Sequence, residues 1–161
     1  MREILFRGKD IAKNWYYGSL HIQDGETDDE GNQCLEYRIL GMRGECDYII
    51  PETVGQYTGL TDKNGKKIFE GDIIRFADIY EYEMYLESLE QPEDYEKKAF
   101  DNMWTIDKVG YGLEYSYPAF DLSKQHFDVN GLSELCESFR YHYEVIGNIH
   151  DNPELLKEGA E

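Results

Sequence analysis

The chain has 161 residues, with 34 acidic against 16 basic side chains and a formal net charge of -18. A field of this sign repels phosphate backbones, so we expect no direct binding to nucleic acid. No apolar run reaches the roughly 20 residues that span a bilayer, and the N-terminus lacks the layout of a signal peptide, so we expect a cytoplasmic protein without membrane contact.

Length and composition favour one domain over residues 1–161, rich in sheet. Fourteen Tyr, seven Phe and two Trp form a high aromatic share, and aromatic side chains suit half-buried pleated surfaces. Cys34, Cys46 and Cys136 lack CxxC spacing, and the four histidines lack the spacing of metal ligands on a helix. We therefore expect buried free thiols and no metal site.

Two strand signals open the chain. Ile4 and Phe6 stand at alternate positions, and a second apolar run at residues 15–17 follows a polar connection. This pattern is typical of an antiparallel hairpin, which we place at a sheet edge. Apolar and polar residues then alternate over residues 35–39, which predicts a half-buried strand.

An acidic stretch, DGETDDE, occupies residues 24–30 between these strands. It has nothing to bury, so we expect a mobile, solvated loop. Read as a calcium-binding loop, it would need Gly at position 29 and Glu at position 35, but these positions hold Asp29 and Leu35. A calcium site is therefore not favoured.

The central stretch at residues 54–76, VGQYTGLTDKNGKKIFEGDIIRF, contains two turns between apolar runs. At residues 62–65 the Asn-Gly pair supplies the positive-φ positions of a tight reversal, which predicts a hairpin. Gly71 marks the second turn, flanked by Glu70 and Asp72. These two carboxylates could bind a divalent cation or act as acid and base, but we favour a structural role in which Asp accepts hydrogen bonds from turn amides.

Residues 78–91 switch to helical spacing, and Pro92 starts a second helix that ends near residue 102. Nine acidic residues and two lysines fall within residues 77–101, a local net charge of -7. We favour an acidic helical insertion at about residues 77–102 with a solvated outer face, and the alternative is a partner-docking surface. That surface would comprise Glu83, Glu87, Glu90, Glu93 and Asp94.

The last third of the chain predicts a strand, a short helix, a second strand and a final helical turn. Apolar residues occupy every second position from 109 to 117, which indicates a strand with an aromatic face. Residues 132–139 have the spacing of a short helix. A strand at residues 143–149 is interrupted by Gly147, and residues 152–154 cap the last helical turn.

Three blocks of the sequence resemble the YopX family: MREILFR at residues 1–7, the stretch at 54–76, and EVIGNIHDNPELL at residues 144–156. The resemblance implies a β-rich protein, encoded by a bacteriophage or prophage, with no established biochemical activity and no catalytic residues to carry over. The insertion at about 77–102 departs from the family pattern. We assign structural roles to Tyr57, Gly59, Asp62, Asn64, Gly65, Glu70, Gly71, Asp72, Gly147, Asn148, Asn152 and Pro153.

These observations predict a mainly β fold with helical additions, either a bent antiparallel sheet or a small, partly open barrel built from hairpins, with α+β as the alternative. No phosphate loop or Gly-x-Ser-x-Gly element occurs, so we expect no enzyme and no cofactor. The favoured function is a non-enzymatic accessory protein of phage or prophage origin that binds a protein partner or itself. The alternatives are an acidic nucleic-acid mimic that inhibits a host DNA- or RNA-handling enzyme, and a metal-dependent enzyme using Glu70 and Asp72.

Overall fold

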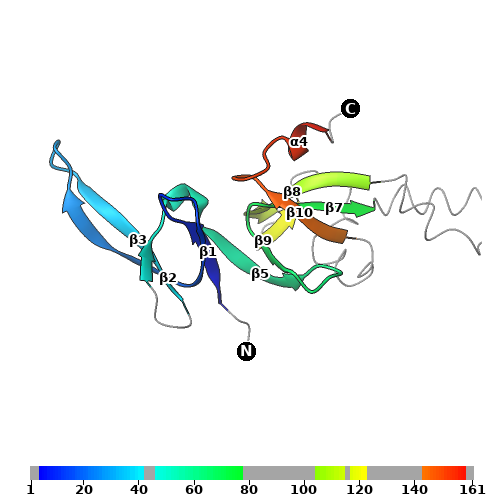
Figure 1. The fold of residues 1–161 in the computed structure, drawn as a ribbon, viewed down its shortest axis with the longest axis horizontal. Coiled ribbons are helices and arrows are strands. Elements are labelled where there is room, and N and C mark those ends of the chain that lie inside the picture. Colours follow the sequence, from blue (N-terminus) through cyan, green and yellow to red (C-terminus); the bar gives the residue numbers. More distant parts are fainter. Residues whose placement is uncertain (1–3, 42–45, 78–103, 115–116, 123–142, 159–161) are drawn as a thin grey trace, which may run out of the picture. The chain divides into compact units, whose positions relative to one another are not determined.

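The structure, a computed structural model, describes residues 4–41, 46–77, 104–114, 117–122 and 143–158 (Figure 1). Strands predominate among these residues and form two antiparallel sheets that do not close into a barrel. The mainly β prediction is confirmed, with open sheets. Contacts divide the chain into two compact units, Met1–Gly59 and Leu60–Glu161, and the assignment of a single domain stays a prediction.

The first sheet has the strand order β4-β3-β2-β1-β5-β6, and β5 carries the chain from the first unit into the second. β1 pairs with β2 on one side and with β5 on the other, so the opening hairpin is confirmed and its predicted edge position is wrong. Local alternation cannot reveal the second neighbour, because it comes from a distant part of the chain. The elements are β1 (Phe6–Lys9), β2 (Trp15–Thr27), β3 (Gln33–Gly41), β4 (Cys46–Tyr48), the 3-10 helix η1 (Pro51–Thr53), β5 (Gly55–Thr61) and β6 (Lys67–Phe69).

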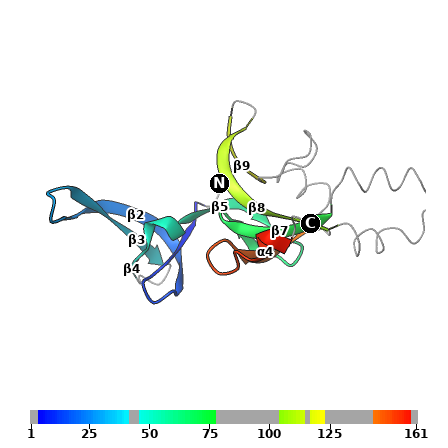
Figure 2. The same cartoon turned by 90° about the horizontal axis from the view of Figure 1, so that it is seen from above.

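β2 and β3 form a long hairpin that runs beyond the strands on either side of it (Figures 1 and 2). β2 continues to Thr27, so the acidic stretch predicted as a mobile loop is mostly strand, and only residues 28–32 form the turn. The reason is pairing: Asp24 lies opposite Leu35 and Thr27 opposite Gln33, and these ladder contacts outweigh the poor strand propensity of acidic residues. We call residues 19–37 the β2–β3 arm.

The first unit buries a small apolar core in which Ile39, Ile49 and Tyr57 are at most 7% exposed. Ile49 packs directly onto β1 at Gly8, where a Cβ atom would lie 2.1 Å from the Ile49 Cγ2 atom. Only glycine fits at that contact. The core is therefore held by a close approach of side chain to backbone, near the base of the β2–β3 arm.

The second unit is built on a four-stranded sheet in the order β10-β7-β8-β9, with every pair antiparallel. The predicted interruption at Gly147 is confirmed as a register shift between Val145 and Gly147 in β10. The core consists of apolar side chains from four strands: Ile68, Ile74, Phe76, Val109 and Tyr143. The elements are β7 (Asp72–Ala77), β8 (Trp104–Glu114), β9 (Tyr117–Leu122), β10 (Tyr143–Asn148) and the helix α4 (Leu155–Glu158).

Several predictions lie outside the described residues. They are the acidic helical insertion, its candidate partner surface, the helix at 132–139 and the thiol of Cys136. Cys34 is described and is exposed, so the prediction of a buried thiol is wrong there, because Cys34 lies on the two-stranded arm. No described helix is long and apolar enough to cross a membrane.

Candidate functional site

Three hairpin turns of this chain, at residues 10–14, 28–32 and 62–66, share one construction. Each begins with Asp, whose carbonyl accepts the N–H of the fourth residue (3.0, 3.0 and 2.9 Å) and whose N–H donates to the carbonyl of the fifth (3.1, 2.9 and 2.8 Å). The carboxylate Oδ1 atom accepts the N–H of the fifth residue at 2.8, 2.8 and 2.9 Å. The fourth residues have positive φ: Lys13 (68°), Gly31 (86°) and Gly65 (79°).

This construction explains the central hairpin. Oδ1 of Asp62 also accepts the N–H of Asn64 at 2.8 Å, so one carboxylate oxygen satisfies two turn amides. Gly65 supplies the single positive φ, and the expectation of two such positions in the Asn-Gly pair is wrong. The loop is a three-residue connection closed by a glycine in the left-handed region, so Asn64 keeps a negative φ.

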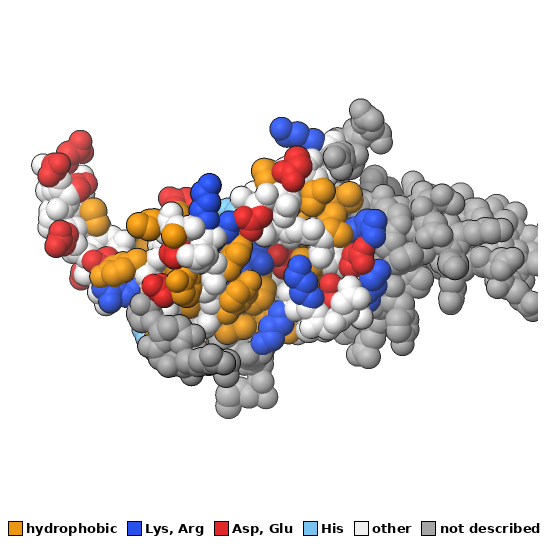
Figure 3. All heavy atoms as spheres, viewed as in Figure 1, with side chains coloured by type: hydrophobic (Ala, Val, Ile, Leu, Met, Phe, Trp, Pro, Cys, Tyr) orange, Lys and Arg blue, Asp and Glu red, His pale blue; other side chains and the backbone are white. Residues whose placement is uncertain are grey.

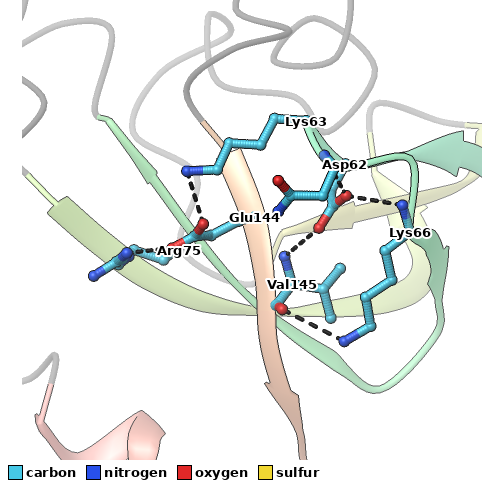
Figure 4. A network of polar contacts seen from close by, with 7 residues as sticks. Asp62, Lys63, Lys66, Arg75, Glu144 and Val145 are labelled. Atoms are coloured by element: carbon cyan, nitrogen blue, oxygen red, sulfur yellow. Dashed lines mark hydrogen bonds and ion pairs between the residues drawn. The ribbon is translucent and has the colours of Figure 1, made fainter.

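The three turns differ at their fifth residue, and this changes the role of the second carboxylate oxygen. In the 10–14 and 28–32 turns the fifth residue is Asn, whose side-chain amide donates to Oδ2 at 3.0 and 3.1 Å. In the 62–66 turn it is Lys66, and Oδ2 of Asp62 instead accepts the N–H of Val145 on β10 at 3.1 Å (Figure 4). The Lys66 Nζ atom lies 3.5 Å from the Val145 carbonyl oxygen. The third turn is thereby fastened to β10.

A second polar contact reinforces this attachment through Glu144, which is 18% exposed at its side chain (Figure 4). The Lys63 Nζ atom lies 2.7 Å from one carboxylate oxygen, and the Arg75 guanidinium pairs with the other. Arg75 stands directly opposite Glu144 in the β7–β10 ladder. The hydrogen bond from Lys63, then Arg75, lowers the pKa of Glu144 below its usual 4.5 despite partial burial. Glu144 therefore joins the turn, β7 and β10.

Gly71 and Asp72 shape the second turn of the central stretch. The Asp72 side chain is 1% exposed, and its Oδ2 atom accepts the N–H of Phe69 at 2.8 Å. Gly71, at a φ of 79°, donates its N–H to the Val109 carbonyl at 2.8 Å and accepts the N–H of Ile149 at 2.9 Å. This carboxylate lies inside a turn rather than in an open site, and Glu70 is only partly exposed beside it.

The closing block forms a compact turn after β10. The Asn148 side-chain oxygen accepts the N–H of His150 and of Asp151, both at 3.0 Å, and its carbonyl accepts the N–H of Asn152 at 2.9 Å. Gly147 leaves room for this turn, since a Cβ atom there would lie 2.6 Å from the Asn152 Oδ1 atom. The exposed Pro153 follows, and α4 begins two residues later.

The sequence did not identify the partners of these motif residues. We missed Lys63, Lys66, Arg75 and the pair Glu144 and Val145, which complete the network of Figure 4. One signal was available: Lys66 stands where two similar turns that begin with Asp have Asn.

The remaining residues to which we assigned structural roles are Tyr57, which is buried, and Gly59, at a φ of 93°. In the part of the chain that the structure describes, no three His, Cys, Asp or Glu side chains group as metal ligands.

These features define a class of β protein with two open antiparallel sheets and signature polar residues that bind turns to strands. The family model described as YopX protein matches residues 5–157, so the chain belongs to the YopX family, and the resemblance seen in the sequence is confirmed. The chain is also similar to the crystal structure of protein EF1440 from Enterococcus faecalis, with 24% identity, 97% of this chain and 99% of that chain covered, and a TM-score of 0.48. No curated protein matches.

Proposed function

We propose that this YopX-family chain is a non-enzymatic accessory protein, of phage or prophage origin, that acts in the cytoplasm by binding another protein. One observation supports the proposal most directly. Seven large apolar side chains of the first unit are exposed. Single exposed apolar residues are ordinary, but exposed apolar residues that share one face of a sheet, as Ile22 and Leu35 do, are typical of an interaction surface. The seven exposed residues are Ile4, Ile11, Tyr17, Ile22, Leu35, Leu40 and Tyr48.

Charge favours a different protein over a second copy of this chain. Two copies would each bring a formal charge of -18, and like charges oppose close association. A basic partner would instead be attracted over long range, and its association would weaken as salt increases. Self-association, the other form of the interaction hypothesis, is an outcome that the test below distinguishes.

Affinity capture and sedimentation test this function. The full-length chain is immobilised at low and at high salt, exposed to lysate of the cells that naturally produce it, and bound proteins are identified. We expect a stoichiometric protein that is released by salt, and a purified chain whose sedimentation coefficient is constant over a hundredfold range of concentration. Concentration-dependent sedimentation with no retained protein would contradict the proposal and favour self-association.

The acidic stretch at residues 24–30 favours a second candidate function. It carries five carboxylates and no lysine or arginine, on the exposed end of the β2–β3 arm. Such an array resembles the charge of a nucleic-acid strand and fits the basic cleft of a DNA- or RNA-handling enzyme. If the captured protein binds DNA, added duplex DNA should release it in competition with this chain, and simultaneous binding of both would contradict mimicry.

A further inference from the structure

The β2–β3 arm is a two-stranded ribbon. β1 pairs with β2 only over Trp15 to Gly18, and β4 pairs with β3 only over Arg38 to Leu40. The Tyr37 carbonyl still accepts the N–H of Ile49 at 2.8 Å, and from there to the tip the ladder pairs β2 with β3 alone (Figure 2). An isolated two-stranded ribbon is marginally stable in water unless one face packs against another surface. The arm is thus an element that gains stability when something covers it.

One face of the arm is apolar. Residues directly opposite each other in an antiparallel ladder share a face, and Ile22 lies opposite Tyr37 while Leu20 lies opposite Ile39. Ile39 is fully buried, whereas Ile22 and Leu35 are each 52% exposed. An apolar stripe therefore continues from the core of the first unit out along the arm as far as Leu35, where Asp24 lies opposite it on the same face. We call its outer part, Leu20, Ile22, Leu35 and Tyr37, the apolar arm face.

The opposite face of the arm is polar and makes its own contacts. Gln23 donates to the Glu36 carboxylate at 2.9 Å, and Arg38 pairs with the same carboxylate at 3.0 Å. The Arg38 guanidinium also lies over the Tyr48 ring, 4.0 Å from its centroid. Along the arm, the polar groups of this face contact one another, whereas Ile22 and Leu35 on the other face are exposed to solvent; the apolar Leu40 lies on the polar face at the base of the arm.

The tip beyond the apolar arm face is strongly acidic (Figure 3, left end). From Asp24 to Leu35 the chain carries five carboxylates and no lysine or arginine. Hydrogen bonds from the Asn32 backbone and side chain lower the pKa of Asp28 below its usual 3.8, so that its charge persists. A surface that covers the apolar face must lie beside this charge, which selects basic side chains and disfavours a second acidic copy.

We infer that the apolar arm face is the docking surface for a partner protein whose contact segment combines apolar side chains with adjacent lysine or arginine. The inference rests on the proposed function, because it assumes that the chain acts by binding another protein. Burial of the exposed apolar side chains supplies the attraction, and the acidic tip selects the partner and fixes its orientation.

Site-specific photo-crosslinking in the cells that naturally produce the protein tests this inference. The photoreactive residue p-benzoylphenylalanine replaces Ile22 on the apolar arm face, Leu40 on the opposite face, or the 91% exposed Ile11 in the 10–14 turn, each in the full-length chain. We expect position 22 to link to a different protein, through a peptide with lysine or arginine near the linked residue. Yields at positions 40 and 11 should be about tenfold lower.

A charge variant tests the role of the tip. Asp24→Asn, Glu26→Gln, Asp29→Asn and Glu30→Gln are combined in the position-22 protein, while Asp28 is kept because it holds the turn. We expect the crosslinking yield to fall about tenfold, with an unchanged circular dichroism spectrum. An unchanged yield would overturn the assignment of a basic partner.

The remaining outcomes separate the inference from the proposed function. Crosslinks at position 22 to another copy of this chain, or equal yields at all three positions, would overturn the inference. Crosslinks to a different protein from position 40 or 11 alone would overturn the inference but leave the proposed function intact. If no position links to another protein and affinity capture also retains none, both are wrong.

Discussion

Two hairpin turns of nearly identical geometry have different roles in this molecule. The 28–32 turn and the 62–66 turn each begin with Asp, close through a positive-φ glycine and use Oδ1 to bind turn amides. Asn32 completes the first turn within itself, whereas Lys66 leaves Oδ2 of Asp62 to bind β10. The fifth residue of a common local turn thus decides whether that turn is self-contained or holds a sheet together.

The two turns also differ in burial, and we expect this to change the free energy needed to open each of them. Asp62 is 5% exposed, and Asp28 is exposed at the end of a two-stranded ribbon. When a buried carboxylate is removed, the amides that donated to it are left without an acceptor. When an exposed carboxylate is removed, water can accept the same hydrogen bonds. We therefore expect the arm to open locally at low cost and the 62–66 turn to open only with the sheet of the second unit.

Removal of the turn carboxylate should produce the largest difference in stability between variants of the two turns. Asp62→Ala removes the acceptor for the amides of Asn64, Lys66 and Val145, so we expect the free energy of unfolding to fall by about 3–4 kcal/mol. Asp28→Ala should have a much smaller effect, because water reaches its amides. Urea unfolding followed by circular dichroism measures the stability of each variant. Asp62→Asn keeps one acceptor oxygen and replaces the other with an NH2 donor, so its loss should lie between those of Asp62→Ala and Asp28→Ala. Equal losses would contradict the difference.

The glycines of the two turns give a matched pair. Gly65 and Gly31 both have positive φ, and a Cβ atom at either position would meet nothing within 4 Å, so backbone strain alone is tested. Gly65→Val should lower the free energy of unfolding by about 1–3 kcal/mol. Gly31→Val should cost less in thermal melts, because the arm tip can distort without disturbing a core. Unchanged stability of the Gly65 variant would disprove the turn assignment.

Acid should weaken the attachment of the 62–66 turn through Glu144. Its pKa is lowered below 4.5 by Lys63 and Arg75, so its carboxylate binds a proton less readily in the folded chain than in the unfolded chain. The resulting stability is present above the unfolded pKa and is lost as pH falls through the folded pKa. Between neutral pH and pH values below 4.5, the parent should therefore lose more stability than Glu144→Gln.

Lys63→Met serves as the control for this titration. It removes the hydrogen bond that contributes most to the lowered pKa of Glu144 but keeps Arg75 and the carboxylate. Its pH dependence should fall between those of the parent and Glu144→Gln. If all three proteins lose stability in parallel on acidification, Glu144 does not couple the turn to β10 in the way that the contacts indicate.

The 10–14 turn offers the smallest and most local test. Lys13 occupies the position of Gly31 and Gly65, and is the only non-glycine residue with a positive φ among those described. Lys13→Gly should remove that strain, although glycine also has greater conformational freedom in the unfolded chain, which opposes the gain. We expect a net rise in the free energy of unfolding of about 0.5–1 kcal/mol. Lys13→Ala, which keeps a Cβ atom, is the control. A thermal melt in which both variants match the parent would contradict the assignment of strain.

Sequence reasoning succeeded where the cause of the structure is local. Gly65, Gly71 and the interruption at Gly147 follow from turn chemistry within a few residues, and the alternating strands follow from side-chain period. It failed at residues 24–27, where acidic side chains disfavour a strand but pairing with β3 imposes one. A single sequence records propensity at each position and does not record the partner strand.

The long-range contacts of the site could not be predicted for the same reason. Asp62 and Val145 are 83 residues apart, and nothing in either segment alone indicates that a carboxylate of one accepts an amide of the other. The sequence did contain a weaker signal. The turns that begin with Asp10 and Asp28 have Asn at their fifth position, whereas the turn that begins with Asp62 has Lys66 there. Comparison of repeated turns within one chain therefore points to the turn whose second carboxylate oxygen is used elsewhere.

Amide hydrogen exchange at single-residue resolution tests the difference between the two turns most directly. The N–H groups of Lys66 and Val145 bind the buried Asp62, and those of Glu30 and Asn32 bind the exposed Asp28. We predict that the first pair exchanges only when the second unit unfolds, and that the second pair exchanges orders of magnitude faster through local opening of the arm. Similar rates for the two pairs would show that the 62–66 turn is not fastened to β10 and would contradict the account.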